Sequence, residues 1–432
     1  MFRLYKKIRY ILGQPDGFRW LTTYVYTFFL VIFLYPIYKI TKKRIGYLRT
    51  DAIGHLAYNT RQFFELVENT EYFLNINKVK MIGDRNTANE FLLNEILKVK
   101  PKKLKFKKFS RFLDNYGKWN FYRLVDKYKF ASEVVIDIER GSQRHRPRKK
   151  YAYYQDYNES KVLDLNYPGL LIPVGNFPIS NYLADHGLNP SRPIMGVIDR
   201  DSAFSTGVPL RDTRIADLNE LCLRLSKAGY QVVRMGSLRE FKVDPSIDGV
   251  LDYPFLKCKS AELDIELCRH LDFYVTWDTG LNTVPMIFNK PTYIITMDFL
   301  PWLPGRSGKI LNNPSIKTVG ADGTAMNIID LIYRTKEYDF TSKKLTNLNL
   351  QSAEIDFEDV MHDIDFFVSK KKLSNKLLSK EKEYTEDLIK ALEWLITHQL
   401  TSKTEEVLYL NQYLLDLHNS RNYVSPSFLE KY

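Results

Sequence analysis

The sequence predicts an α/β protein in which two domains of parallel strands and helices lie between an N-terminal apolar segment and a C-terminal helical extension. Short apolar runs alternate with helical patterns along most of the chain, and glycine-containing turns follow several of these runs. A chain of 432 residues is also too long for one ordinary hydrophobic core. The expected segments are residues 1–43, 44–185, 194–340 and 341–432.

Residues 272–291 form the stretch around which this prediction is organised. The apolar run Phe273–Trp277 is typical of a buried strand, and Asp278, Thr279 and Gly280 then form a turn before a helical pattern. A helix start presents unpaired N–H groups and the positive end of the helix dipole, and glycine lets an anion approach the backbone. The pattern indicates a phosphate site. An ordinary strand-to-helix turn that Asp278 or Thr279 caps fits it as well.

The composition indicates a partner with negative charge. The formal net charge is +12 and the sequence pI is near 9.2. Nucleic acid, an anionic membrane surface and a phosphate-bearing substrate all suit this balance, and the charge does not distinguish them. Cys222, Cys258 and Cys268 lack the spacing of a zinc site or a disulfide framework, so we expect reduced thiols of a cytoplasmic protein.

The N-terminal segment carries an uncharged run over residues 20–38 with basic residues on both sides. Its length is close to the roughly 20 apolar residues of a transmembrane helix. Tryptophan and tyrosine stand at its ends, where membrane interfaces favour them. The pattern favours association with an anionic membrane, either as a span or as a helix that rests on the leaflet. A buried core helix is the alternative.

The first domain begins with a strand over residues 44–49 and a turn that carries Asp51, Gly54 and His55. Asp and His can both move protons, and the first such turn of a parallel α/β domain faces the crevice at the carboxyl ends of the strands. We therefore expect a functional loop here, although a lone histidine is usually only a polar group near a helix start. Further elements are expected over 78–83, 133–138 and 169–174 as strands and over 88–99 as a helix.

The rest of the first domain is basic and rich in loops. Residues 100–130 interleave lysine with aromatic residues, which suits single-stranded nucleic acid but is more often an amphipathic surface. Residues 144–150 form a basic loop that we expect to face solvent or lipid. Residues 175–193 are rich in proline and glycine and mark the domain boundary.

The second domain repeats a strand–helix alternation that predicts a parallel sheet. Strands are expected over 194–199, 230–235, 272–277 and 291–296, and helices over 215–228, 260–270 and 279–288. Polar side chains gather at or after the carboxyl ends of these strands, where arginine suits bidentate binding of phosphate. These residues, which together suggest a diphosphate site, are Arg200, Asp201, Arg211, Arg214 and Arg234. In the tail, residues 373–399 and 405–418 have helical spacing.

These residues resemble a known family. Asp278-Thr279-Gly280, with Lys290-Pro291 downstream, resembles the sugar-nucleotide motif D-[ST]-G…[GN]-K-P of bacterial GT-B glycosyltransferases, including the heptosyltransferases. Other segments look like glycosyltransferases of surface-polysaccharide gene clusters, namely residues 49–57, 88–89, 200–202, 211–214 and 229–236. The resemblance covers about residues 44–300 and departs from the family at 210–214. It implies two Rossmann-like domains that face a crevice.

The resemblance also implies site residues on both sides of that crevice. The acceptor-side loop would include Gly54 and Asn59. The nucleotide-sugar site would comprise Arg200, Asp201, Arg211, Arg214, Arg234, Gly236, Asp278, Thr279 and Gly280.

Our first hypothesis is an inverting glycosyl transfer that needs no metal and no cofactor. Arginines would stabilise the leaving diphosphate, and His55, or otherwise Asp51, would deprotonate a hydroxyl of a glycan or lipid-linked acceptor. The enzyme would serve bacterial polysaccharide synthesis at the inner membrane, with its catalytic domains in the cytoplasm and with no nucleic acid as partner.

Two other hypotheses remain open. Asp199-Arg200-Asp201 is an Asp-x-Asp sequence after a strand, which could hold a divalent metal in a metal-dependent transferase. Such triplets often occur by chance. A non-enzymatic basic protein that binds a membrane or nucleic acid would explain the charge, but it gives no reason for the arginines at the strand ends.

Overall fold

The computed structural model divides into two compact units, Met1–Val162 (unit 1) and Leu163–Tyr432 (unit 2). The boundaries expected from sequence, and the crevice between two domains, stay predictions. The structure describes residues 17–48, 50, 53–54, 56–57, 60, 64, 78–83, 87–102, 104–108, 130, 135–137, 177–200, 213–236, 241–277, 279–295, 310–312, 315–319, 325–336, 351–352, 355–399 and 424–432.

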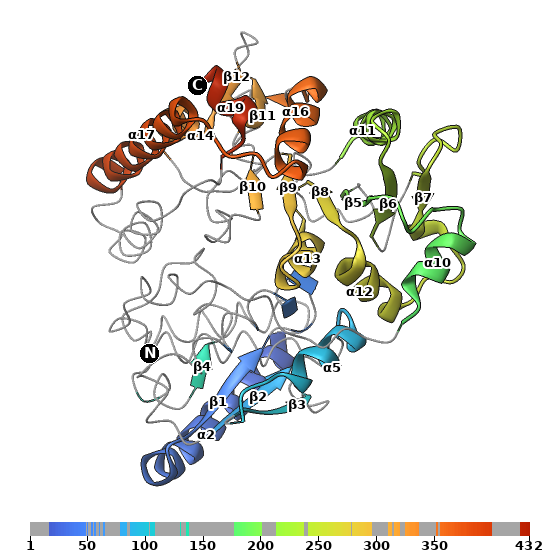
Figure 1. Cartoon of the computed structure of the whole chain (residues 1–432). Coiled ribbons are helices and arrows are strands. Elements are labelled where there is room, and N and C mark those ends of the chain that lie inside the picture. Colours follow the sequence, from blue (N-terminus) through green and yellow to red (C-terminus); the bar gives the residue numbers. More distant parts are fainter. Residues whose placement is uncertain are drawn as a thin grey trace. The chain divides into compact units, whose positions relative to one another are not determined.

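Unit 1 contains a four-stranded parallel sheet in the order β3-β2-β1-β4 (Figure 1). Its strands are β1 (Lys43–Leu48), β2 (Lys78–Gly83), β3 (Leu104–Lys108) and β4 (Val135–Asp137). The strands predicted over 44–49, 78–83 and 133–138 are confirmed. β3 was not predicted, because the exposed Lys105 and Lys107 alternate with the buried Leu104 on this edge strand and hide its apolar character.

Two helices of unit 1 were also predicted. The apolar segment forms α2 (Gly17–Thr41), of which Leu21–Thr41 is long and apolar enough to cross a membrane by length and composition. The second helix is α5 (Glu90–Lys98), whose N-cap Asn89 accepts a hydrogen bond from the Leu92 N–H at 2.8 Å.

Unit 2 contains a six-stranded parallel sheet in the order β10-β9-β8-β5-β6-β7 (Figure 1). All four predicted strands are present, and β7 and β10 are additional. The strands are β5 (Ile194–Ile198), β6 (Gln231–Met235), β7 (Val250–Asp252), β8 (Phe273–Thr276), β9 (Thr292–Ile294) and β10 (Ile310–Asn312). The central strands are buried along their whole length, as expected for a parallel sheet that is covered on both faces.

Helices pack on both faces of this sheet. α11 (Ile215–Lys227) and α16 (Phe357–Val368) share one hydrophobic core with β5, β6, β8 and β9. α12 (Ala261–His270) receives a hydrogen bond from a side chain of β8 on the opposite face. A short helix, α10 (Ile179–Asp185), and a 3₁₀ turn, η5 (Tyr253–Phe255), complete this part. Residues 175–193 were expected to be rich in loops, but Ile179–Asp185 form a helix. This helix was not predicted, because its mixed sequence ISNYLAD lacks a strong helical period.

Tyr274 fixes the distance between β8 and α12. Its hydroxyl donates to the Leu267 carbonyl at 2.7 Å, and its ring lies over Gly196 of β5. A Cβ at Gly196 would stand 2.5 Å from Cδ1 of Tyr274, which is closer than real Cβ contacts allow. The glycine therefore provides the space that the tyrosine ring occupies.

Replacing Gly196 with alanine is expected to lower the free energy of unfolding by about 1–3 kcal/mol, as for other overpacked cores. Urea unfolding of the full chain, followed by amide hydrogen exchange in β5 and β8, measures the loss. In a Tyr274→Leu background the same substitution should cost much less, because the opposing ring is gone. An equal cost in both backgrounds would contradict this account.

The helical extension has its own hydrophobic core. α14 (Ile328–Thr335), α17 (Asn375–Gln399) and α19 (Pro426–Lys431) contribute most of its buried residues. A small antiparallel sheet of β11 (Ser315–Val319), β12 (Ala325–Asn327) and β13 (Gln351–Ser352) has the strand order β12-β11-β13. Along the chain, β11 and β12 precede α14, and β13 follows it. The helix predicted over 373–399 is confirmed, whereas 169–174 and 405–418 lie outside the described residues.

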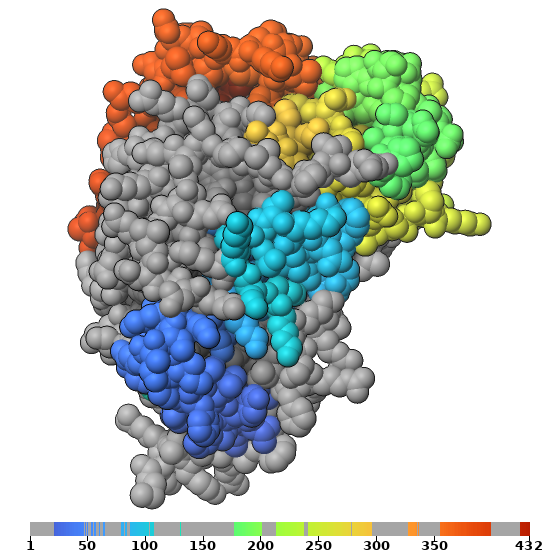
Figure 2. All heavy atoms as spheres, turned by 60° about the horizontal axis from the view of Figure 1, so that its bottom comes forward, coloured from blue at the N-terminus to red at the C-terminus, as the bar shows by residue number. Residues whose placement is uncertain are grey.

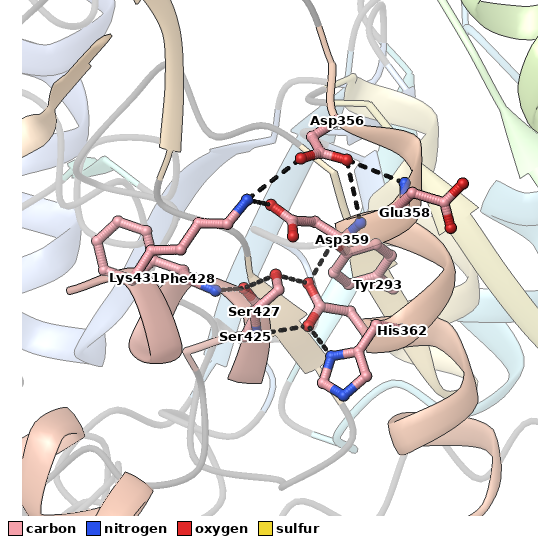
Figure 3. A network of polar contacts seen from close by, with 10 residues as sticks. Tyr293, Asp356, Glu358, Asp359, His362, Ser425, Ser427, Phe428 and Lys431 are labelled. Atoms are coloured by element: carbon pink, nitrogen blue, oxygen red, sulfur yellow. Dashed lines mark hydrogen bonds and ion pairs between the residues drawn. The ribbon is translucent and has the colours of Figure 1, made fainter.

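Within unit 2, a polar network joins α19 to α16 and to the six-stranded sheet (Figure 3). Asp363 of α16 accepts hydrogen bonds from Ser427 N at 2.9 Å, Ser427 Oγ at 2.7 Å and the Tyr293 hydroxyl of β9 at 2.8 Å. Burial raises the pKa of Asp363, and these donors act in the opposite direction. Lys431 pairs with Asp356 and Asp359 on the same side of α16. The last helix is thus attached to the sheet through α16.

All three cysteines are free thiols. Cys222 and Cys268 are buried, and burial raises the pKa of Cys222 to about 12 and that of Cys268 well above its ordinary value. Cys258 is exposed. Only this thiol is therefore accessible to reagents in the folded chain.

Candidate functional site

The strand order of the unit 2 sheet reverses between β5 and β8. β6 and β7 extend the sheet beyond β5, and β9 and β10 extend it beyond β8. In open parallel sheets of this order, ligands bind outside the carboxyl ends of the strands at the reversal. The residues that follow Ile198 and Thr276 therefore form the candidate site.

Arg234 joins the carboxyl ends of three neighbouring strands on one side of this point. Its Nε and Nη2 donate to the two carboxylate oxygens of Asp199 at 3.1 and 3.0 Å, and its Nη1 lies 3.2 Å from Asp252 Oδ1. Asp199 follows β5, Arg234 lies in β6 and Asp252 ends β7. The guanidinium side chain is only 1% exposed. The described contacts of Arg234 link the ends of these three strands to one another rather than bind a phosphate group.

Burial and ion pairing act in opposite directions on the pKa values of Arg234 and Asp252. Burial alone would lower the pKa of Arg234, but the bonds to Asp199 and the charges of both carboxylates raise it above the ordinary value. Burial raises the pKa of Asp252 although the Val243 N–H and Arg234 favour its charged form. Both oxygens of Asp199 are engaged by Arg234, so a metal at the Asp-x-Asp sequence would first have to displace the guanidinium.

Two other predicted arginines lie beside this cluster. Arg200 is buried directly after Asp199, and its backbone N–H donates to Thr213 Oγ1 at 3.2 Å. That bond joins the two ends of the segment 201–212. Arg214 is the N-cap residue of α11, and it makes a two-point ion pair with Asp217 on a side chain that is 54% exposed.

The turn after β8 differs from the expected helix start. Gly280–Asn282 form a 3₁₀ turn (η6), and the α-helix that follows, α13 (Thr283–Ile287), has little more than one turn. Thr279 caps the turn by accepting the Leu281 N–H at 3.2 Å. Thr283 and Pro285 explain the short helix, because β-branched residues and proline disfavour extension. The predicted helix dipole is therefore weak here, and the capping interpretation of Thr279 is the one that the structure describes.

Two buried polar side chains at this edge have no hydrogen-bond partner among the residues that the structure describes. The amide oxygen and nitrogen of Asn282 are both unpaired, although the residue is only 1% exposed. The hydroxyl of Thr276, at the end of β8, is also buried and unpaired. A buried polar group without a partner costs about 1–3 kcal/mol, which marks both residues as candidates to bind a ligand. Neither residue was predicted as a site residue from the sequence.

Several predicted site residues cannot be placed. Asp51, His55 and Asn59 on the acceptor side, and Asp201, Arg211 and Asp278 on the donor side, lie outside the described residues. Gly54 is half-buried and helical rather than part of a loop. Gly236 is buried directly after β6 with a φ of 146°, a backbone conformation that favours glycine.

The unit 1 sheet has a reversal of its own, between β1 and β4. After β1, the Thr50 carbonyl accepts the Ala88 N–H at 2.7 Å, and Thr50 is buried. Leu56 and Phe64, which follow this turn, are buried. Thr50 therefore anchors the backbone just after β1, and the expected residues Asp51 and His55 lie outside the described residues.

Among known proteins, only solved structures match this chain. No protein-family model and no curated protein matches this chain. The chain is similar to ADP-heptose lipopolysaccharide heptosyltransferase II of E. coli at 14% identity and a TM-score of 0.38, over 62% of this chain and 89% of that one. It is similar to a family 9 glycosyltransferase of Veillonella parvula at 9% identity and a TM-score of 0.42, over 71% and 96%.

A third similar structure is the E. coli heptosyltransferase WaaC with ADP-2-deoxy-2-fluoro heptose. It has 12% identity and a TM-score of 0.33, over 58% of this chain and 88% of that one. These neighbours belong to the class of enzyme that the motifs after β5 and β8 resemble. At these TM-scores the functional argument depends on the site itself.

Proposed function

We propose that this chain is a glycosyltransferase that moves a sugar from a nucleotide-diphosphate sugar to a glycan or lipid-linked acceptor. The observation that carries the proposal is the Asn282 amide at the reversal of the unit 2 sheet, which has no hydrogen-bond partner in the part of the chain that the structure describes. An amide offers both a donor and an acceptor, which suits the hydroxyl groups of a sugar or ribose. Thr276 adds a second unpaired hydroxyl at the same strand end.

The donor diphosphate would lie beside Arg200, with Arg211 from the segment 201–212 and Arg214 directly after Thr213. Arg234 would act by holding Asp199 and the ends of β5–β7 in place, rather than by touching phosphate. Thr279 and Gly280 would present the turn backbone on the other side. His55 or Asp51 would deprotonate the acceptor hydroxyl, which gives inversion.

Metal independence is part of the proposal, and the pairing of Asp199 with Arg234 supports it. A metal-dependent Asp-x-Asp transferase would need that carboxylate as an oxygen ligand. We further propose that the enzyme serves bacterial cell-surface polysaccharide synthesis from the cytoplasmic side of the inner membrane. The resemblance of its motifs to polysaccharide-cluster enzymes supports this placement.

The test is nucleoside diphosphate release by the detergent-solubilised full-length protein from a panel of nucleotide sugars, with and without a strong chelator. Release from one donor, insensitive to chelator and reduced at least tenfold in Arg200→Ala, is the expected result. Arg192→Ala is the matched control, because Arg192 precedes β5 at the other edge of the sheet and bonds the Gly229 carbonyl at 2.5 Å.

Other outcomes have distinct meanings. Loss of release with chelator would replace this mechanism with the metal-dependent one. A donor that is neither hydrolysed nor bound, measured by thermal shift and calorimetry across the panel, would favour a non-enzymatic binding protein. Specific protection by RNA or DNA would support that reading further.

A further inference from the structure

Helix α2 has two faces of opposite accessibility. Thr23, Thr27 and Val31 lie four residues apart on one face and are buried. The Thr27 hydroxyl donates to the Thr23 carbonyl at 2.7 Å, so its polarity is satisfied within the helix. Phe28 and Tyr35 contact Phe130 edge to face. One side of α2 therefore packs on unit 1.

The opposite face is apolar and exposed to solvent. Figure 2 shows part of the segment 21–48, in blue, at the surface. Phe33 is 71% exposed and Ile40 is 84% exposed. The exposed large apolar residues recur every three or four positions and comprise Val25, Tyr26, Phe29, Ile32, Phe33, Ile37 and Ile40. Contiguous apolar surface of this kind marks an interaction site, because single exposed apolar residues are normal but a stripe along a helix is not.

The end of α2 carries positive charge next to aromatic rings. Lys39, Lys42 and Lys43 are exposed. Lys39 Nζ lies 5.0 Å from the centre of the Tyr35 ring, and Lys42 Nζ lies 5.4 Å from that of Tyr38. Tyrosine and lysine together are typical of the headgroup level of a membrane, and each cation attracts anionic lipid.

The connection to the sheet argues against a span. Lys42 turns the chain with a φ of 52°, and β1 begins at the next residue. Arg44 of β1 donates to the Tyr38 hydroxyl at 3.1 Å, which holds the end of α2 against the first strand of the sheet. A helix that crossed the bilayer would also have to give up its ring contacts with Phe130 and the burial of Thr23, Thr27 and Val31.

We propose that α2 lies in the plane of an anionic membrane surface, with the Phe33–Ile40 side inserted among the lipids and the Thr23–Val31 side on unit 1. The lysines at its C-terminal end contact the headgroups. Unit 1 is thereby held at the bilayer without a transmembrane segment. The inference stands apart from the transferase proposal, since lipid binding can be measured without a sugar donor.

The first test is sedimentation of the purified full-length protein with phosphatidylglycerol-containing vesicles and with phosphatidylcholine vesicles. We expect binding to the anionic vesicles, and at least a tenfold loss of affinity in the double variant Phe33→Ser/Ile40→Ser. The matched control is Phe241→Ser/Leu378→Ser, which removes exposed apolar side chains of unit 2. Equal losses in both variants, or equal binding to both vesicles, would overturn the proposal.

The second test separates an in-plane helix from a span. A nitroxide label is placed at Tyr26, Phe33 or Ile40 in a Cys258→Ser background, since the two remaining cysteines are buried. An in-plane helix predicts the same shallow depth at all three positions. A span predicts that Tyr26 and Ile40 lie roughly 21 Å apart along the bilayer normal, at about 1.5 Å per residue, so that the label at Phe33 between them is the deepest. A protein that binds no vesicle but dimerises through this face would also exclude the lipid surface.

Discussion

Replacing Arg234 with methionine is expected to lower the free energy of unfolding of unit 2 by about 3–5 kcal/mol. The guanidinium is buried and bonds Asp199, Asp252 and the Phe241 carbonyl, whose bond to Nη1 is 2.6 Å long. Methionine fills a similar volume but leaves two carboxylates in the interior without their cation. Urea unfolding, read from hydrogen exchange in β5, β6 and β7, measures the loss.

The matched control is Arg214→Met. Arg214 makes a comparable two-point pair with Asp217, but its side chain is largely exposed, so its loss should cost less than about 1 kcal/mol. A similar small cost for Arg234→Met would show that the buried pair contributes little.

The deficit of Arg234→Met should also depend on pH. Burial already raises the pKa of Asp252, and removing Arg234 takes away an interaction that lowers it. A carboxyl whose folded pKa lies above its unfolded value adds stability below the unfolded pKa and loses it as pH rises through the folded pKa. The variant should therefore recover part of its stability as pH falls from 8 to 5, and a deficit that does not shrink would contradict the assignment.

Replacing Asn282 with leucine is expected to have opposite effects on stability and function. Leucine is of similar volume and removes two buried unpaired groups, so the free energy of unfolding should stay constant or rise by about 1 kcal/mol. Under the proposed function, donor affinity and kcat/KM should fall by about 10–100-fold, as one lost ligand hydrogen bond of about 1.5–3 kcal/mol implies. Calorimetric donor binding and urea unfolding give the two readouts.

Asn89→Leu is the natural comparison, because Asn89 is equally buried but has its partner. It caps α5 through the Leu92 N–H, and removing such a cap costs about 0.5–2 kcal/mol. If Asn282→Leu destabilises the protein as much as Asn89→Leu does, Asn282 is a structural residue, and the proposal that its amide binds the sugar donor is wrong.

The parallel sheets could be predicted because their central strands are short apolar runs between glycine and proline. Strands such as Gln231–Met235 are buried on both faces, and such runs are easily recognised. β3 and β7 were missed because a lysine-rich edge and a three-residue strand have no such pattern. The helix after Thr279 is shorter than predicted. Its apolar residues have helical spacing, but Thr283 and Pro285 disfavour a longer helix.

The candidate site was predicted only as a region. Arginines at strand ends indicated the carboxyl-end edge of the sheet, but the sequence cannot show that Arg234 pairs in register with Asp252 and reaches Asp199, which follows β5. That pairing depends on strand order, which is a property of the whole sheet. In the sequence, Asn282 stands out only as a polar residue between Leu281 and Val284. Its burial, and the absence of a hydrogen-bond partner among the described residues, are visible only in three dimensions.

The attachment of α19 to Asp363 affects the order in which the chain can mature during synthesis. Domains generally fold as the ribosome delivers them, the N-terminal one first. α2 and the strands of the unit 1 sheet precede unit 2 along the chain, whereas Ser427, which donates to the buried Asp363 carboxylate, follows that residue by 64 positions. The nascent chain can therefore fold unit 1 well before Asp363 gains these partners, and until residue 427 emerges the carboxylate lacks two of the three hydrogen bonds described above.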